Sequence, residues 1–345
     1  MTLHLSPSEH HRYLTERIRP SMRFRGNDVR KWRARLLPKL AELLGDRPDR
    51  PCPLKPNRIW RQQHELGTIE KVSFASEPFS DVVAYVCIPK GLRPPYPFSI
   101  CLQGHTTGMH HSIGVERLED TKPMAVEGDR DFGLSSMRNG MAALCIEQRS
   151  FGLRRERKQE QVSKHGCHDA AAQALLLGRT LLGERVYDVS RGIDYLSARG
   201  DADMNRVGIM GNSGGGVVTI YAAALLRHRI AWAMPSCSFC TFRDSILSID
   251  HCIDNFIPGL YKYAEMADVM GLFAPKPLLV VAGKEDTIFP LPGVRRAFRD
   301  LRRIYKAYEA DSRCQLVLGN EGHRFYAATA WPALRRLLAG AQWSK

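Results

Sequence analysis

Residues 206–216 read Arg206-Val207-Gly208-Ile209-Met210-Gly211-Asn212-Ser213-Gly214-Gly215-Gly216. The stretch begins as a short apolar strand, turns at the motif G-x-S-x-G centred on Ser213, and continues into a helix-forming segment from Val217 to Leu226. A strand-to-helix reversal this tight admits only small residues beside the serine, so the hydroxyl is held above the end of the strand. The helix N-terminus beneath it favours negative charge. The stretch therefore predicts an α/β fold that carries a serine nucleophile.

Two further candidates for a catalytic triad follow Ser213 along the chain. A buried strand is predicted over 277–283 and is followed by Asp286, and a strand over 314–318 leads to His323. The order serine, aspartate, histidine differs from that of chymotrypsin or subtilisin, and each residue follows the carboxyl end of a predicted strand, where open α/β sheets place their sites. Glu285 is the alternative acid and His251 the alternative base; we favour Asp286 and His323.

The roles of these residues follow from the chemistry of acyl transfer. A serine hydroxyl is a poor nucleophile at neutral pH, so His323 would take its proton, while Asp286 would orient and stabilise the imidazole. The tetrahedral oxyanion needs N–H donors. One is expected from the backbone of Gly214, and the other from the loop after the strand predicted over 98–102. In that loop we favour the His105 N–H, with Thr106 as the second choice.

The composition agrees with one large enzyme core. The chain has 345 residues, of which 44% are hydrophobic, and no run of about 18 apolar residues that would span a membrane. Its first residues lack the pattern of a signal peptide, so we expect a cytoplasmic protein. The nine cysteines are expected to be reduced thiols. Cys237 and Cys240 form a C-x-x-C, which we interpret as buried thiols rather than a zinc or redox pair.

The net charge of +14 raises the question of nucleic-acid binding. The basic residues are dispersed, and those over 295–306 fall at helical spacing, which is typical of a solvated helix face. No nucleic-acid-binding signature accompanies them. Adjacent His110 and His111 are interpreted as exposed residues of a polar loop rather than metal ligands. We expect a small-molecule ester substrate, no nucleic acid or membrane partner, and no metal or cofactor; a homo-oligomer stays open.

The chain divides into two parts. Residues 1–62 are predicted to form a helical, basic N-terminal extension, and 63–345 the catalytic domain. Two antiparallel strands followed by strands that alternate with helices predict a mostly parallel sheet of about eight strands. A cap-like insertion over about 236–272 is rich in aromatic residues, so Phe239 and Phe242 are candidates for the substrate pocket, with core packing as the alternative.

Five segments together resemble the acetyl xylan esterase-like α/β-hydrolases, relatives of dienelactone hydrolases and of the peptidase domain of prolyl oligopeptidases. These segments are LQGH (102–105), EQRSFG (147–152), GNSGG (211–215), HCIDNFIPG (251–259) and EGH (321–323). The resemblance covers about residues 65–340 and implies the α/β-hydrolase fold and hydrolysis of small acyl esters, such as acetyl groups on sugars. The usual His-Gly of the oxyanion loop is Gln103-Gly104 here, which changes the side chain expected to face the substrate, so Gln103 and Thr106 join the candidate pocket.

The leading hypothesis is a serine carboxylesterase that works through an acyl-enzyme on Ser213. A peptidase like the prolyl oligopeptidases is the alternative enzyme, although the first 60 or so residues are too short for a propeller domain. A catalytically silent α/β-hydrolase that acts as a binding protein is the alternative from another class, and the complete triad argues against it. A basic nucleic-acid binder would bind in a salt-dependent manner that survives Ser213→Ala.

Overall fold

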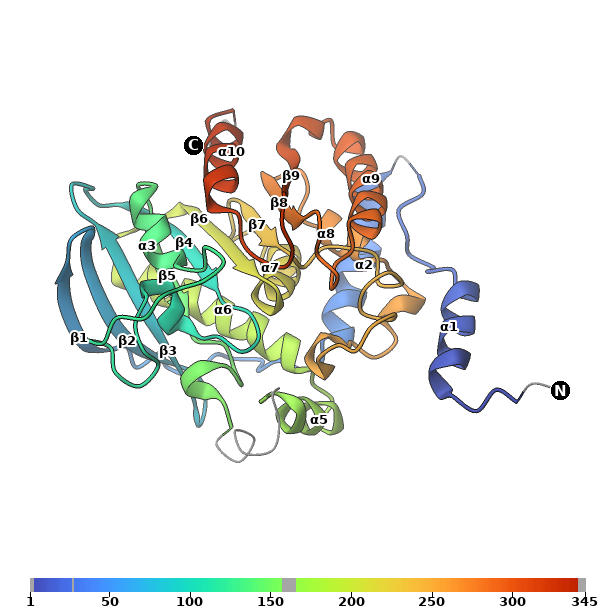
Figure 1. The fold of residues 1–345 in the computed structure, drawn as a ribbon, viewed down its shortest axis with the longest axis horizontal. Helices are drawn as coiled ribbons and strands as arrows, with labels where there is room; N and C mark the ends of the chain where they lie inside the picture. Colours follow the sequence, from blue (N-terminus) through green and yellow to red (C-terminus); the bar gives the residue numbers. More distant parts are fainter. Residues whose placement is uncertain (1–2, 27, 157–165, 341–345) are drawn as a thin grey trace.

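A nine-stranded sheet forms the centre of the computed structural model, which describes residues 3–26, 28–156 and 166–340 (Figure 1). The strands stand in the order β1-β2-β3-β5-β4-β6-β7-β8-β9. The first pairings, β1 with β2, β2 with β3 and β3 with β5, are antiparallel, and all pairings from β5 through β4 to β9 are parallel. The strands are β1 Asn57–His64, β2 Gly67–Glu77, β3 Ser80–Pro89, β4 Tyr96–Leu102, β5 Ala142–Ile146, β6 Ala202–Asn212, β7 Ala233–Ser236, β8 Leu278–Gly283 and β9 Cys314–Gly319.

The parallel strands are covered on both faces, as their apolar sequences require. Successive residues of β4 show the alternation: Ile100 belongs to one core and Cys101 to the other. The larger core also contains side chains of α2 Val29–Leu43, α6 Leu181–Arg199, α7 Gly214–Leu225, α8 Met266–Gly271 and α9 Leu291–Ala307. The opposite core contains side chains of α3 Phe132–Arg138 and α10 Ala327–Ala339. The predicted α/β-hydrolase fold is confirmed.

The N-terminal part is helical, as predicted, but it ends earlier than expected. Helix α1, Pro7–Arg17, lies at the edge of the molecule, apart from the sheet, whereas α2 packs into the larger core through Leu36 and Leu40 (Figure 1). Strand β1 begins at Asn57, inside the range assigned to the extension, and pairs with β2. The sheet therefore gains an antiparallel edge strand that the polar sequence of residues 57–64 did not reveal, because its side chains are mostly exposed.

Two connections position the loops at the carboxyl ends of the strands. The one between β4 and α3 begins with the short helix η1, Met109–Ile113, and is fixed at Asp120, which bonds the Lys71 ammonium at 2.6 Å. The insertion after β7 contains the short helices η3 Ile253–Asn255 and η4 Leu260–Lys262 before α8. In the sequence between these two connections, helix α5, His168–Leu176, precedes α6. Among the described residues, no helix is long and apolar enough to cross a bilayer.

Candidate active site

Ser213 occupies a strained turn between β6 and α7. Its backbone has φ 56° and ψ −125°, a region that non-glycine residues rarely adopt and that is found at functional sites. The Ser213 N–H donates to the carbonyl of Ser236 at 2.9 Å, which holds the turn against β7. Gly215 has no room for a side chain, because a β-carbon there would lie 2.2 Å from the Leu102 carbonyl oxygen. The turn is the nucleophile elbow expected from the sequence, and Ser213 remains partly exposed.

His323 and Asp286 meet across 37 residues of sequence. His323 Nδ1 and Asp286 Oδ2 are 2.8 Å apart, and Asp286 Oδ1 accepts the N–H groups of Ile288 and Phe289 at 2.8 and 3.1 Å. Burial opposes the ionised carboxylate, but the hydrogen bond from His323 and the two backbone N–H groups keep the pKa of Asp286 below its usual value. The aspartate is therefore the ionised partner that orients the ring.

The other ring nitrogen of His323 is available for proton transfer. Its Nε2 is buried and makes no hydrogen bond to any residue that the structure describes. The ring is stacked on Phe289 at a centroid distance of 6.0 Å, which limits its tilt. Hydrogen bonds between a nucleophile and its base are often long in enzymes without substrate and shorten in the complex. The arrangement is that of a base poised over the end of the sheet.

The two alternatives considered for the triad occupy other positions. Glu285 is exposed, whereas Asp286 is buried against the histidine. His251 bonds the Asn255 amide at 2.9 Å, and burial lowers its pKa to about 4. His251 also touches Phe289 edge-on, so it lies near the site without contacting the acid. The structure thus brings His323 together with Asp286, as favoured from the sequence.

The loop after β4 passes directly beside the serine. A β-carbon at Gly104 would lie 2.9 Å from the Ser213 β-carbon, so only glycine allows this approach. Gly214 is the first residue of α7, and its N–H therefore has no acceptor within the helix. The His105 ring lies against Gly214, with Nδ1 2.8 Å from where a β-carbon of Gly214 would stand. Gly214 and the segment Gly104–His105 thus both lie next to Ser213.

His105 is held from behind by a buried ion pair that sequence reasoning missed. Its Nε2 lies 2.9 Å from Asp254 Oδ2, and Arg185 Nη1 lies 2.5 Å from the same oxygen. Burial disfavours charge on the ring, but Asp254 raises the pKa of His105 to about 9. His105 and Arg185 in turn hold the pKa of the Asp254 carboxyl well below its usual range. Asp254 lies in one of the segments that carry the family resemblance, which was the available signal.

A cavity of about 220 Å³ opens beside this loop. His105, Thr106 and Phe151 are among its lining residues, and the Phe151 ring lies 3.4 Å from the β-carbon position of Gly214. Thr106 thus lines a cavity beside this loop, and none of the three triad candidates is among its lining residues. The volume of about 220 Å³ lies below the range of about 300–1,000 Å³ that is typical of ligand pockets. A cavity of this size has room only for a small chemical group beside His105 and Thr106.

Three residues expected in the substrate pocket lie elsewhere. Gln103 is 1% exposed, and its amide donates to the Ser112 hydroxyl and the Arg130 carbonyl, so it supports the loop from inside. Phe239 and Phe242 are buried members of the larger core. The alternative of core packing therefore describes both aromatic residues, because the insertion folds back onto the helices rather than standing free.

The cysteine pairings differ from the sequence pattern. Cys237 and Cys240 are buried thiols, as interpreted; they donate to different carbonyls, and burial raises the pKa of each to about 12. The close pair is instead Cys167 and Cys252, separated by 85 residues, with Sγ atoms 2.50 Å apart. This pair lies beside His105 and Asp254.

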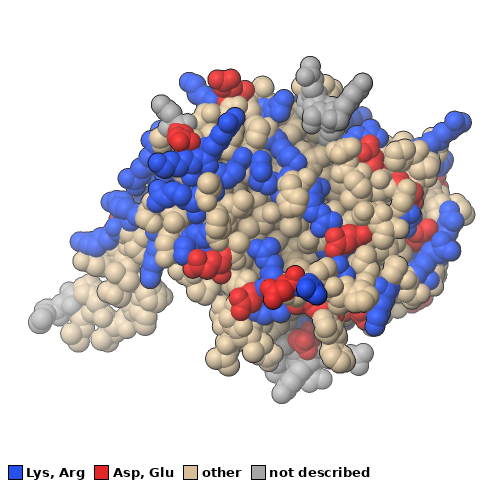
Figure 2. Space-filling model, turned by 180° about the vertical axis from the view of Figure 1, so that it is seen from behind, with Lys and Arg blue, Asp and Glu red and all other residues tan. Residues whose placement is uncertain are grey.

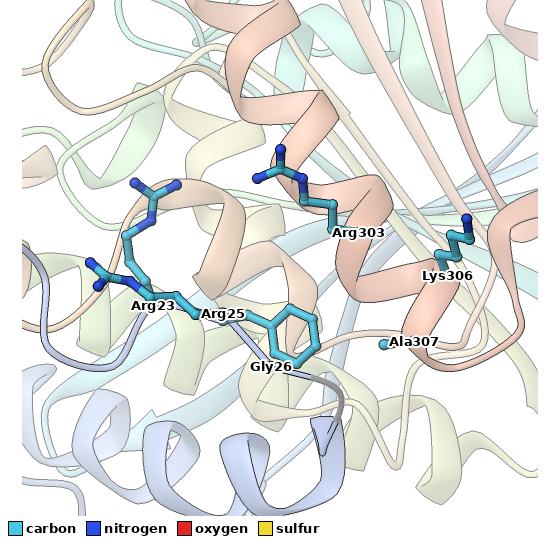
Figure 3. A pocket seen from close by; sticks show the side chains of 7 residues that line it. Arg23, Arg25, Gly26, Arg303, Lys306 and Ala307 are labelled. Atoms are coloured by element: carbon cyan, nitrogen blue, oxygen red, sulfur yellow. The ribbon is translucent and has the colours of Figure 1, made fainter.

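The largest cavity described, about 710 Å³, belongs to another part of the molecule. Arg23 and Arg25 face Arg303 and Lys306 of α9 across it (Figure 3). Figure 2 shows Lys and Arg side chains gathered over this side of the molecule. The basic helix expected as a simple solvated face thus lines a hollow, where Arg23 also bonds Asp300 at 2.6 Å. None of the candidate catalytic residues lines it, so cavity size does not mark the site.

Comparisons with known proteins agree with this geometry. A model described as the prolyl oligopeptidase family matches residues 177–339, which include all three triad candidates. YtaP, a candidate hydrolase of Bacillus subtilis (strain 168), is 27% identical over 308 residues, covering 88% of this chain and 98% of the relative. A candidate acetyl xylan esterase of Bacteroides fragilis NCTC 9343 superposes with a TM-score of 0.74 at 17% identity, over 96% of this chain and 85% of the other.

The chain has the α/β-hydrolase fold. A glucuronoyl esterase from Solibacter usitatus shares the fold with a TM-score of 0.67 and 16% identity, over 93% of this chain and 97% of the other. The resemblance to the acetyl xylan esterase-like α/β-hydrolases is confirmed, and the chain is an enzyme of the hydrolase class.

Proposed function

We propose that this α/β-hydrolase is a serine carboxylesterase that removes small acyl groups, acetyl above all, from carbohydrate esters. The observation that carries the proposal is the strained elbow at Ser213 together with the bonded pair of His323 and Asp286, all of which follow the carboxyl ends of parallel strands of one sheet. The cavity of about 220 Å³ next to Gly214 supports a small acyl group. The sugar esters come from the names of similar structures, an acetyl xylan esterase and glucuronoyl esterases.

The reaction begins with proton transfer from Ser213 to His323. As the serine oxygen attacks the ester carbonyl carbon, Nε2 of His323 takes the hydroxyl proton, and Asp286 stabilises the resulting imidazolium through Nδ1. The carbonyl oxygen becomes an oxyanion that accepts N–H groups of Gly214 and His105. Collapse of the intermediate breaks the bond to the leaving alkoxide oxygen, which receives the proton from His323.

Deacylation uses the same groups in reverse. A water molecule gives a proton to His323 as its oxygen attacks the acyl carbon on Ser213. As the second tetrahedral intermediate collapses, His323 returns the proton to the serine oxygen and the carboxylic acid is released. Every step therefore needs one base whose ring is fixed by an ionised acid, which Asp286 supplies.

The matching experiment compares wild type with Ser213→Ala on p-nitrophenyl acetate and butyrate, together with labelling by a fluorophosphonate. We expect an acetate preference, and we expect Ser213→Ala to lose labelling and at least about 10⁴-fold in kcat. The matched control is Ser248→Ala, because Ser248 is an exposed serine of the insertion. This variant should keep the fluorophosphonate labelling and the kcat of the wild type. Absence of labelling in folded wild type would overturn the proposal and favour a silent binding protein.

The match to the prolyl oligopeptidase family makes a serine peptidase the second candidate. Both activities would use the same triad, so Ser213→Ala does not separate them. A proline-containing peptide p-nitroanilide and an acetylated xylo-oligosaccharide do separate them, when compared by kcat/KM. Preference for the acetylated sugar supports the esterase, and cleavage of the anilide without acetyl release supports the peptidase.

A further inference from the structure

Four potential metal ligands converge behind the loop after β4. They come from three separate segments, and one ligand atom of each lies within 4.8 Å of all the others; they are His105, Cys167, Cys252 and Asp254. Cys167 precedes α5, and Cys252 and Asp254 flank the start of η3. Ligand atoms in a tetrahedral zinc site lie roughly 3–4 Å apart, given bonds of about 2.0–2.3 Å. The cluster therefore needs only small shifts to surround an ion.

The burial of the cluster is typical of a closed metal site. Cys167 and the Asp254 carboxylate are fully buried, and the His105 side chain is 16% exposed. The Cα atoms of Cys167 and Cys252 are 7.7 Å apart, beyond the roughly 4.4–6.8 Å that disulfides usually span. Two cysteines that bind the same metal ion do not need so short a Cα–Cα distance, because their sulfur atoms are not bonded to each other. Sulfur ligands together with imidazole and carboxylate select zinc among the common divalent ions.

The surrounding charges balance a zinc ion. Two thiolates and one carboxylate carry three negative charges, one more than Zn²⁺ neutralises. Arg185 supplies the missing positive charge, because its guanidinium is 2% exposed and contacts Asp254 Oδ2 at 2.5 Å. It is itself held by the Arg149 carbonyl at 2.9 Å and lies over the Phe151 ring at 4.2 Å. Such outer contacts fix ligand orientation in zinc sites.

We propose that this cluster binds one zinc ion through His105, Cys167, Cys252 and Asp254. The ion binds as each thiol and the Nε2–H of His105 release their protons to water, and Nε2 then donates its lone pair to the ion in place of its hydrogen bond with Asp254. It ties the oxyanion loop at His105 to α5 and to the insertion, segments separated from it by up to 149 residues. The site differs from the expectation of no metal and goes beyond the proposed function, since it serves any reaction at Ser213.

The test measures metal in the full-length protein, independently of activity. Protein is prepared under reducing conditions with added Zn²⁺, dialysed against metal-free buffer and analysed by elemental mass spectrometry. We expect about one zinc per chain in wild type and in the control Cys52→Ser, a partly exposed cysteine outside the cluster. Cys167→Ser and Cys252→Ser should each lower the bound zinc at least ten-fold. Circular dichroism checks that the variants fold.

A second measurement needs no variant. Replacement of zinc by Co²⁺ in wild type should give the intense thiolate-to-cobalt absorption of a tetrahedral site with sulfur ligands. Thiols are also counted in denaturant without reductant: nine reactive thiols are expected after removal of zinc. Seven thiols and no metal would show a Cys167–Cys252 disulfide and overturn the proposal. Zinc that persists in both cysteine variants would overturn it as well.

Discussion

Two histidine–aspartate pairs occur in the loops that follow strands of the sheet, and they are built differently. In the first, His323 presents Nδ1 to Asp286 and keeps Nε2 without a partner among the described residues. In the second, His105 presents Nε2 to Asp254, and Arg185 contacts the same carboxylate. The distances are nearly the same, 2.8 and 2.9 Å. The pairs differ in which nitrogen is held and in what else the carboxylate bonds.

The difference shows that a histidine–carboxylate bond does not by itself make a general base. Asp286 takes its other hydrogen bonds from backbone N–H groups, so its charge is directed to the His323 ring. Asp254 instead shares its charge between the His105 ring and the Arg185 guanidinium in a buried cluster. We therefore expect the first pair to act as the base and the second to fix the position of a loop.

A third buried carboxylate near the site is bound by backbone N–H groups. Glu147 accepts the N–H groups of Met109 and Leu153, each at 3.0 Å. Burial raises its pKa to about 7, only partly opposed by these N–H groups. The pKa values of Asp254 and Asp286 shift downward instead, so the partner, and not burial alone, decides the charge state.

The largest expected effect separates the two histidines. His323→Ala removes the base, and we expect kcat on p-nitrophenyl acetate to fall by about 10⁵-fold or more. His105→Ala keeps its backbone N–H and loses only the ring that fixes the loop, so a fall of about 10- to 100-fold is expected. Both variants are measured at saturating substrate after a check of folding. Equal losses would show that the His105 side chain takes part in the chemistry.

The two aspartates should differ in what they stabilise. Asp286→Asn is expected to lower kcat by about 10⁴-fold, because the ring loses its charged partner, with little change in stability. Asp254→Asn should act mainly on folding, since it leaves Arg185 buried without a countercharge, a loss of about 3–5 kcal/mol in the free energy of unfolding. Urea unfolding and steady-state kinetics on both variants test this. An unchanged unfolding midpoint in Asp254→Asn would contradict it.

The smallest expected effect concerns Glu147 and pH. The folded state keeps its proton up to about pH 7, whereas the unfolded chain loses it near its ordinary pKa, so the free energy of unfolding falls as the pH rises between about 4.5 and 7. The total change is up to about 3 kcal/mol. Glu147→Gln should flatten this slope in urea titrations at pH 5, 6 and 7. The exposed Glu119→Gln serves as control and should keep the slope of the wild type.

The sequence predicted the fold well because its signals are local. The G-x-S-x-G turn needs a tight reversal and small neighbours, and the structure shows that strain at Ser213. The antiparallel strands at 67–77 and 80–89 follow from residue alternation. Strand β1 was not predicted, because an exposed polar edge strand has no apolar pattern. The ninth strand is thus the part of the sheet that the sequence left out.

The sequence predicted those candidate site residues that could be placed from their order in the chain and from the ends of the predicted strands. Asp286 and His323 each follow a strand of a parallel sheet, whose carboxyl ends share one edge, so their meeting could be expected. Gln103, Phe239 and Phe242 were expected in the substrate pocket and lie in the interior instead. Composition cannot tell an aromatic pocket wall from an aromatic core, because both are apolar.

The sequence by itself determined the elbow, the chain order of the triad and the α/β class, since these depend on local backbone geometry and on periodicity. Only the tertiary structure decided that Cys167 stands opposite Cys252, and that Asp254 and Arg185 hold His105. These residues are 69 to 149 positions apart, and no local pattern links them. Their meeting depends on how the insertion and α5 pack at the carboxyl edge of the sheet, which is a property of the whole chain.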